Sequence, residues 1–245
     1  YVTQRARYKV ANSEYLRTAL GESSRNMSVV PNFLPPTGNA MQPPTVVPSI
    51  RRVITVSNGF KGLKNVHNAL RAFQFAREKI QSVEYVLVGT ECGPSGSAAS
   101  YAKQHGLADG VLFLGWQPHD KTRALIRSAT VLLHPALEES FGMTVLEAMA
   151  EGTVVVAGET TGNIPELLAY GECGFLCDVR SVRSIGQTLC MALGDSERRK
   201  EIERKAHEYF VEEYSEVCVL DILQKLYGSI LMESTVEAKR EAIQP

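Results

Sequence analysis

Short apolar runs alternate with amphipathic segments from Arg52 onward, and this alternation restricts the fold more than any other feature of the sequence. Five runs are short and apolar enough to be buried strands, at residues 53–56, 85–88, 111–114, 130–134 and 154–157. The segments between them have helical spacing, as in the first, whose apolar positions are Val66, Leu70, Phe73 and Ile80. Repeated strand–helix–strand units require parallel, right-handed crossovers. The sequence therefore predicts an α/β fold with a doubly wound, Rossmann-like parallel sheet.

Proline marks a boundary before this region. Six of the eleven prolines fall within eighteen residues, so we expect residues 35–50 to form a Pro-rich linker. Residues 1–34 have the patterns of two short strands and of a helix capped by Ser13, which are too few elements for an independent domain. The expected strands lie at residues 9–12 and 27–30.

The end of the chain is expected to be helical. After a sheet domain at residues 51–215, residues 216–245 form a predicted helical tail. One apolar stripe runs along it and must pack on another surface. The stripe consists of Ile222, Leu223, Leu226, Tyr227 and Ile230.

Charge and cysteine content exclude several classes of function. Lys and Arg total 26 against 27 Asp and Glu, so no net positive field is available to hold nucleic acid, and an anionic ligand must be bound locally. The five cysteines show no zinc-ligand spacing, although Cys173 and Cys177 bracket a predicted turn and short strand. No apolar run approaches the length of a membrane span. A reducing, cytoplasmic location is expected, with peripheral membrane association as an alternative; the chain begins at Tyr1, which is typical of a fragment.

Residues 134–152 contain the strongest candidate site. Glu139 and Glu147 are separated by seven residues, and Phe141, Gly142 and Met143 stand at the start of a predicted helix. Unpaired amides of a first helical turn can bind phosphate, and Gly142 allows a ligand to approach. Glu147 could accept hydrogen bonds from a ribose diol, and Glu139 could orient a second sugar. A solvated acidic loop is the structural alternative.

These residues resemble a known family. The segment from Glu139 to Ala150 is similar to the E-x7-E signature of retaining nucleotide-sugar glycosyltransferases of the two-Rossmann-domain type, particularly glycosyltransferase family 4. The similarity extends over about residues 50–230, and it identifies the chain as the donor-binding half. It also implies that residues 1–34 are the remnant of the end of an N-terminal acceptor domain. The resemblance implies that Glu139 contacts the donor sugar, that Glu147 contacts the ribose, and that the backbone of residues 141–143 contacts sugar and phosphate.

The same resemblance implicates two further loops in donor binding. After the first strand the family has an arginine and then a lysine on the diphosphate; Lys64 fits the lysine place, Asn58 stands in the arginine place, and Lys61 could compensate. A lysine-rich solvated turn is the alternative. After the fifth strand, Gly162 and Asn163 occupy a place where the family has two glycines near the donor. Asn163 tolerates a positive φ, but Asn163 with Glu166 also fits a capping box.

The resemblance implies transfer of a sugar from a nucleoside-diphosphate donor to an acceptor hydroxyl, with retention and without a metal or other cofactor. The partners are then the nucleotide-sugar donor, an acceptor that the sequence does not identify, and a missing N-terminal Rossmann-like domain. A non-catalytic, nucleotide-sugar-binding regulatory module is the alternative. A dehydrogenase is excluded, because residues 58–64 lack Gly-x-Gly-x-x-Gly. His134 ends a predicted strand and faces the expected cleft, where a packing role is the alternative to a catalytic one.

Overall fold

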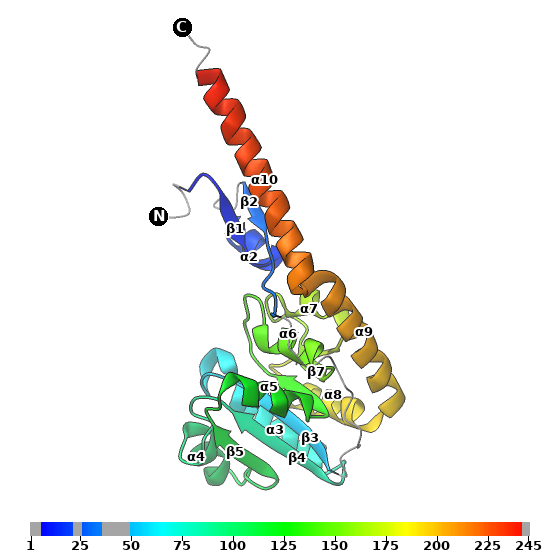
Figure 1. Cartoon of the computed structure of the whole chain (residues 1–245). Helices are drawn as coiled ribbons and strands as arrows, with labels where there is room; N and C mark the ends of the chain where they lie inside the picture. Colours follow the sequence, from blue (N-terminus) through cyan, green and yellow to red (C-terminus); the bar gives the residue numbers. More distant parts are fainter. Residues whose placement is uncertain (1–5, 22–25, 36–49, 242–245) are drawn as a thin grey trace. The chain divides into compact units, whose positions relative to one another are not determined.

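The computed structural model describes residues 6–21, 26–35 and 50–241. The chain divides into two compact units, one made of residues 1–36 with 211–245 and the other of residues 37–210 (Figure 1). The Pro-rich linker expected at 35–50 lies, apart from its two ends, outside the described residues.

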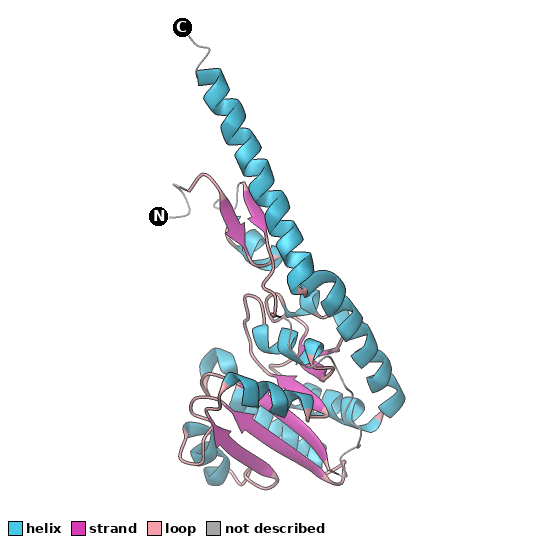
Figure 2. Cartoon of the chain, viewed as in Figure 1, coloured by secondary structure: helices cyan, strands magenta, loops and turns pink. Residues whose placement is uncertain are grey.

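A six-stranded sheet forms the centre of the larger unit (Figure 2). Every neighbouring pair is parallel and the strand order is β5-β4-β3-β6-β7-β8, which confirms the predicted doubly wound sheet. All five predicted runs are strands, and the short segment between Cys173 and Cys177 adds the sixth. The strands are β3 (Arg51–Val56), β4 (Val83–Val88), β5 (Val111–Gly115), β6 (Val131–His134), β7 (Val154–Gly158) and β8 (Phe175–Cys177).

Helices cover both faces of this sheet, because alternate side chains of each central strand point to opposite faces. Val53, Leu87 and Leu133 belong to one buried cluster with residues of α3, α4 and α8. The alternate residues Ile54 and Leu132 are also buried, and α5 and α6 contact strands of the sheet as well as each other. The helices are α3 (Val66–Arg77), α4 (Ser97–Gln104), α5 (His119–Arg127), α6 (Met143–Ala150), α7 (Ile164–Leu167), α8 (Val182–Gly194) and α9 (Ser196–Tyr214), with 3-10 turns η2 (Gly62–Lys64) and η3 (Ala169–Gly171).

The strand order reverses between β3 and β6, which lie side by side. Buried hydrogen bonds fix this junction: the Thr55 hydroxyl donates to the carbonyl of Leu133 at 2.6 Å and lies 2.7 Å from the Tyr85 hydroxyl. In a doubly wound sheet, ligands bind beyond the carboxyl ends of the strands at such a reversal. The loops that follow β3, β6 and β7 are therefore held in the place where a ligand is expected.

The smaller unit contains the two ends of the chain. Strands β1 (Lys9–Ala11) and β2 (Met27–Val29) form a parallel pair, and α2 (Glu14–Ala19) begins at Ser13, whose hydroxyl accepts from the Leu16 amide at 3.1 Å. The predicted tail is the helix α10 (Glu216–Glu241). Four positions of its apolar stripe are half-buried, and Tyr227 is exposed. Within the described ranges, no helix combines the length and the apolar character that a membrane span requires.

Candidate functional site

A hollow of about 120 Å³ lies at the carboxyl ends of β3 and β6. It brings together three residues that the sequence singles out for donor binding, Asn58, Lys64 and Glu139, which come from two loops far apart in the chain. The other lining residues are Val56, Ser57, His134, Pro135, Ala136 and Thr144.

Asn65 holds the loop that carries Lys64. It is buried and has a left-handed backbone with φ 53°, a conformation that asparagine tolerates better than most residues. Its side-chain amide donates to the carbonyls of Pro135 at 3.0 Å and Val179 at 2.8 Å. The loop after β3 is thus tied to the loops after β6 and β8, and this fixes the start of the Lys64 side chain. Sequence reasoning gave Asn65 no role, although an asparagine directly before a helix was a usable signal.

Three polar groups face one another inside the hollow. Glu139 Oε2 lies 3.8 Å from Lys64 Nζ and 3.7 Å from His134 Nε2. Burial, reinforced by the positive charge of Lys64, lowers the pKa of His134 to about 4. The imidazole is therefore neutral at pH 7, and its contact with Glu139 is not an ion pair. His134 Nε2 is buried and has no hydrogen-bond partner among the described residues.

Gly142 shapes the start of α6. Its φ is +100°, a conformation that L side chains rarely adopt, and a Cβ there would lie 2.6 Å from Ile164 Cδ1, so glycine is favoured. The first intrahelical hydrogen bonds of α6 are donated by Val145 and Leu146 to the Gly142 carbonyl. The amides before them, at the positive end of the helix, are suited to an anion. Phe141 is buried, whereas Met143 is exposed.

Glu147 lies apart from this hollow. Its side chain is 11% exposed, and its Oε1 is 2.9 Å from His119 Nε2 on the first turn of α5. Glu147 is not among the residues that line the hollow, so the two glutamates have different surroundings. Sequence reasoning missed His119, because no local pattern links residues 28 positions apart.

The loop after β7 packs against the backbone of Glu139. Gly162 has φ +50°, and a Cβ there would lie 1.9 Å from the Glu139 carbonyl oxygen. The Asn163 amide donates to the same carbonyl at 3.0 Å, and its side chain donates to Phe141 O at 3.3 Å. The capping interpretation of Asn163 is wrong, because its side chain makes no capping bond to α7. Its φ is −77°, so the positive φ that an asparagine tolerates is not used here. The side chain has a longer-range partner, which replaces the capping box.

Asn58 and Lys61 are the remaining predicted residues. Asn58 is exposed at the hollow and accepts a hydrogen bond from the Thr90 hydroxyl at 3.1 Å. Lys61 is exposed and is not among the lining residues. Burial raises the pKa of the Cys177 thiol to about 12, so this cysteine is an inert core residue. Within the described ranges, no three His, Cys, Asp or Glu side chains are grouped as a metal site.

Residues 41–209 match the family described as glycosyl transferases group 1. The chain is 28% identical over 183 residues to the D-inositol 3-phosphate glycosyltransferase of Corynebacterium glutamicum, covering 74% of this chain and 43% of the relative. It is 29% identical to the N-acetyl-alpha-D-glucosaminyl L-malate synthase of Bacillus anthracis, covering 74% and 46%. The chain thus spans less than half the length of these relatives.

Solved structures share the fold. Anabaena HepE, in a complex with UDP and glucose, superimposes with a TM-score of 0.79 at 21% identity, over 93% of this chain and 65% of HepE. A glycosyltransferase from Rickettsia africae superimposes with a TM-score of 0.75 at 17% identity, over 91% of this chain and 64% of that protein.

Proposed function

Since the chain belongs to the glycosyl transferases group 1 family, we propose that it is the donor-binding half of a retaining glycosyltransferase. The enzyme would transfer a sugar from a nucleoside-diphosphate sugar to an acceptor hydroxyl. The observation that carries this proposal is the convergence of Lys64 and Glu139 at the point where the strand order reverses, next to the start of α6. A cation and helix amides suit a diphosphate, and a carboxylate suits a sugar hydroxyl.

Each residue has a distinct part in the proposed reaction. Lys64 and the first amides of α6 stabilise the negative charge that develops on the leaving diphosphate. Glu139 holds the glycosyl group, and Glu147, beside His119, binds the ribose diol. The bond between the anomeric carbon and the phosphate oxygen breaks while the acceptor oxygen bonds to the same face of that carbon. The acceptor proton passes to the leaving phosphate, so no protein nucleophile is needed.

The acceptor side of the cleft is proposed to belong to a further Rossmann-like domain. The support is that the chain spans 43% and 46% of two curated relatives. Holding both substrates in register contributes roughly 7–11 kcal/mol to such reactions. We therefore expect these 245 residues to bind donor but not to transfer sugar at an appreciable rate. Turnover equal to that of a chain carrying the acceptor domain, with the same labelled donor and acceptor, would contradict this.

A binding module without catalysis is a second candidate, and Asn58 favours it. Lys64 is the single cation among the described residues that line the hollow, and Asn58 stands where the family has an arginine. An asparagine cannot form the bidentate bonds that arginine makes to phosphate. The candidates are separated by hydrolysis of bound nucleotide sugar in the full-length protein: the enzyme releases sugar and diphosphate, whereas the module leaves the donor intact.

Donor binding is tested by thermal unfolding with UDP, GDP and ADP and with their sugar conjugates. A ligand at about 100 times its dissociation constant adds roughly 2.7 kcal/mol to the free energy of unfolding. Lys64→Ala should weaken the best ligand at least about tenfold, because a charge-assisted contact is lost. Lys61→Ala is the matched control and should change affinity less than about threefold. A folded sample that none of these ligands stabilises would refute the proposal.

A further inference from the structure

The His134 imidazole is a buried polar group without a use in the reaction described so far. Its side chain is 8% exposed and lies at the end of β6, a strand whose preceding residues Leu132 and Leu133 are fully buried. Nε2 is buried without a hydrogen-bond partner among the described residues. Burying an unsatisfied polar atom costs roughly 1–3 kcal/mol, and a leucine here would avoid that cost. Packing alone therefore does not account for a histidine at this position.

The surroundings of Nε2 restrict what can bind it. Nε2 lies 3.7 Å from Glu139 Oε2, too far for a hydrogen bond, and Lys64 Nζ lies 3.8 Å from the same oxygen. An atom that bridges these groups must donate to a carboxylate, so a phosphate oxygen is repelled there. A hydroxyl donates to the carboxylate and still accepts from a nitrogen. One hydroxyl oxygen placed about 2.8 Å from Nε2 and from Oε2 satisfies both atoms.

We propose that His134 is a donor-contacting residue that, together with Glu139, hydrogen-bonds one hydroxyl of the transferred sugar. This inference rests on the proposed function, since it assigns one contact within the same site. The position of the His134 ring is fixed by its place at the carboxyl end of β6. The contact therefore selects for sugars that have a hydroxyl within reach of Nε2 and Glu139. Burial and Lys64 keep the imidazole neutral, so Nε2 can share a hydroxyl with the charged carboxylate without forming an ion pair with it.

The experiment compares three variants by calorimetric titration. His134→Leu fills the space without a polar atom, His134→Gln carries an amide that reaches the position of Nε2, and His134→Asn carries an amide one bond too short. The probes are the pairs UDP with UDP-glucose, GDP with GDP-mannose and ADP with ADP-glucose, of which the pair that binds the wild-type protein is used. The Leu and Asn variants should bind the nucleotide sugar about tenfold more weakly, and the Gln variant should stay within about threefold of the wild-type protein. The free diphosphate should change less than about twofold in all three.

Deoxyfluoro analogues of the bound sugar identify the hydroxyl. A fluorine cannot donate to Glu139 and accepts only weakly from Nε2, so one analogue should bind the wild-type protein more weakly than the intact donor. His134→Leu should weaken this analogue less than it weakens the intact donor. Equal losses for the free diphosphate and the nucleotide sugar would place His134 on the phosphate and overturn the inference. Unchanged affinity in the Leu and Asn variants would overturn it as well. If none of UDP, GDP, ADP and their sugar conjugates stabilises the wild-type protein, the proposed function fails and the inference fails with it.

Discussion

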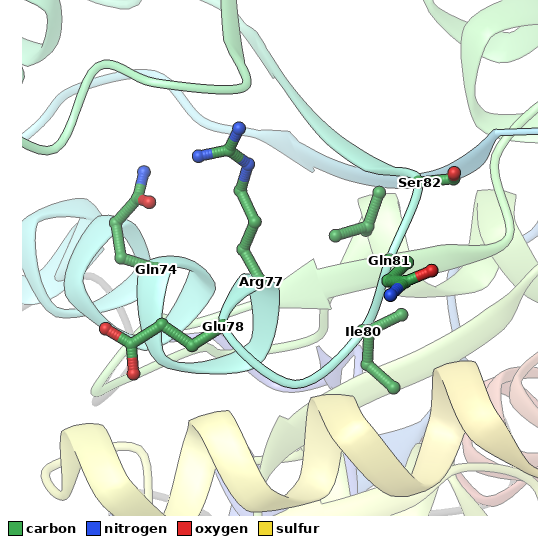
Figure 3. Close-up of a pocket in the computed structure, with 7 residues that line it drawn as sticks. Gln74, Arg77, Glu78, Ile80, Gln81 and Ser82 are labelled. Atoms are coloured by element: carbon green, nitrogen blue, oxygen red, sulfur yellow. The ribbon is translucent and has the colours of Figure 1, made fainter.

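The sheet has a hollow at each end, and the larger one lacks the features of a binding site. It measures about 370 Å³, against about 120 Å³ at the carboxyl ends of the strands. It lies between the end of α3 and the start of β4. Figure 3 shows Gln74 and Arg77 on the helix, Glu78 directly after it, and the other labelled residues in the loop that follows. Its lining comes from one segment, residues 74–83.

Two polar side chains of the larger hollow already have partners within the protein. Arg77 pairs with Asp109, and the Gln74 amide donates to the carbonyls of Leu107 at 3.0 Å and Asp109 at 2.8 Å. In the smaller hollow, His134 Nε2 has no hydrogen-bond partner among the described residues, and groups from separate loops converge. Available polar atoms brought together from separate loops, rather than volume, therefore mark the candidate site.

Asn65→Ala tests this contrast with the largest expected effect. It leaves the carbonyls of Pro135 and Val179 without their donor and places alanine in a left-handed backbone, so we expect a loss of about 3–4 kcal/mol in the free energy of unfolding. Gln74→Ala, at the larger hollow, should cost about 1 kcal/mol, because its contacts are partly exposed. Urea unfolding measures both losses. Asn65→Gly removes the same hydrogen bonds without the backbone strain, so its comparison with Asn65→Ala gives the backbone contribution. Similar costs for Asn65→Ala and Gln74→Ala would remove the distinction between the two ends.

Acid should destabilise the smaller hollow through His134. The pKa of this group is about 4 in the folded state and 6.5 in the reference state, so the unfolded chain binds more protons between these values. The contribution of neutral His134 to the free energy of unfolding is therefore fully present above pH 6.5. It is lost as the pH drops towards 4, by about 3 kcal/mol in all. Lys64 and Glu139 are the charged groups that face the ring. The measurement is the stability difference between wild type and His134→Gln, which should shift in favour of the variant by about 2 kcal/mol from pH 7.5 to 5. A constant difference would contradict the burial of a neutral imidazole.

The two glutamates should be separable by ligand. Glu147→Ala should weaken a free nucleoside diphosphate and its sugar conjugate alike, by about tenfold, because both contain the ribose. Glu139→Ala should weaken only the sugar conjugate. Glu78→Ala, at the larger hollow, is the matched control and should change neither. Calorimetric titration with UDP and UDP-glucose, or with GDP and GDP-mannose, gives the answer; equal losses in both glutamate variants would refute the division of roles.

Arg77→Ala should have the smallest effect. Its ion pair with Asp109 is exposed on the aspartate side, so we expect a loss of less than about 1 kcal/mol in stability and no change in nucleotide affinity. Thermal unfolding with and without ligand tests both statements. An affinity loss above about threefold would make the larger hollow the better candidate for the site.

The sheet was largely predictable because its strands are short apolar runs. The starts of β3 and β4 could not be predicted, because Arg52 and Glu84 interrupt the apolar pattern. The two side chains pair across the strands at 2.6 Å. A search for buried apolar runs does not find a charged cross-strand pair, because each charged residue taken alone indicates a solvent-exposed position.

The site was predictable where the signal is local. The motif around Glu139 and the lysine loop identified residues that share one hollow. The partners of Asn163 and Glu147 were not predictable, because they lie 22 and 28 residues away and only the fold brings them together. Asn65 stands between these cases: its backbone conformation could be anticipated, but its two carbonyl partners could not.

The hydrogen bonds of Asn65 and Asn163 imply that these loops are shaped before any donor arrives. Ordering a flexible side chain on binding costs roughly 0.5–1.5 kcal/mol, and a loop already held by its own backbone does not lose that freedom again. We therefore expect recognition of the proposed donor on this side to be close to lock-and-key, with little change in these loops on binding. The choice of sugar is then expected to reside in a few side chains that project from a rigid frame, so that donor preference could be re-engineered at single positions without rebuilding the loops.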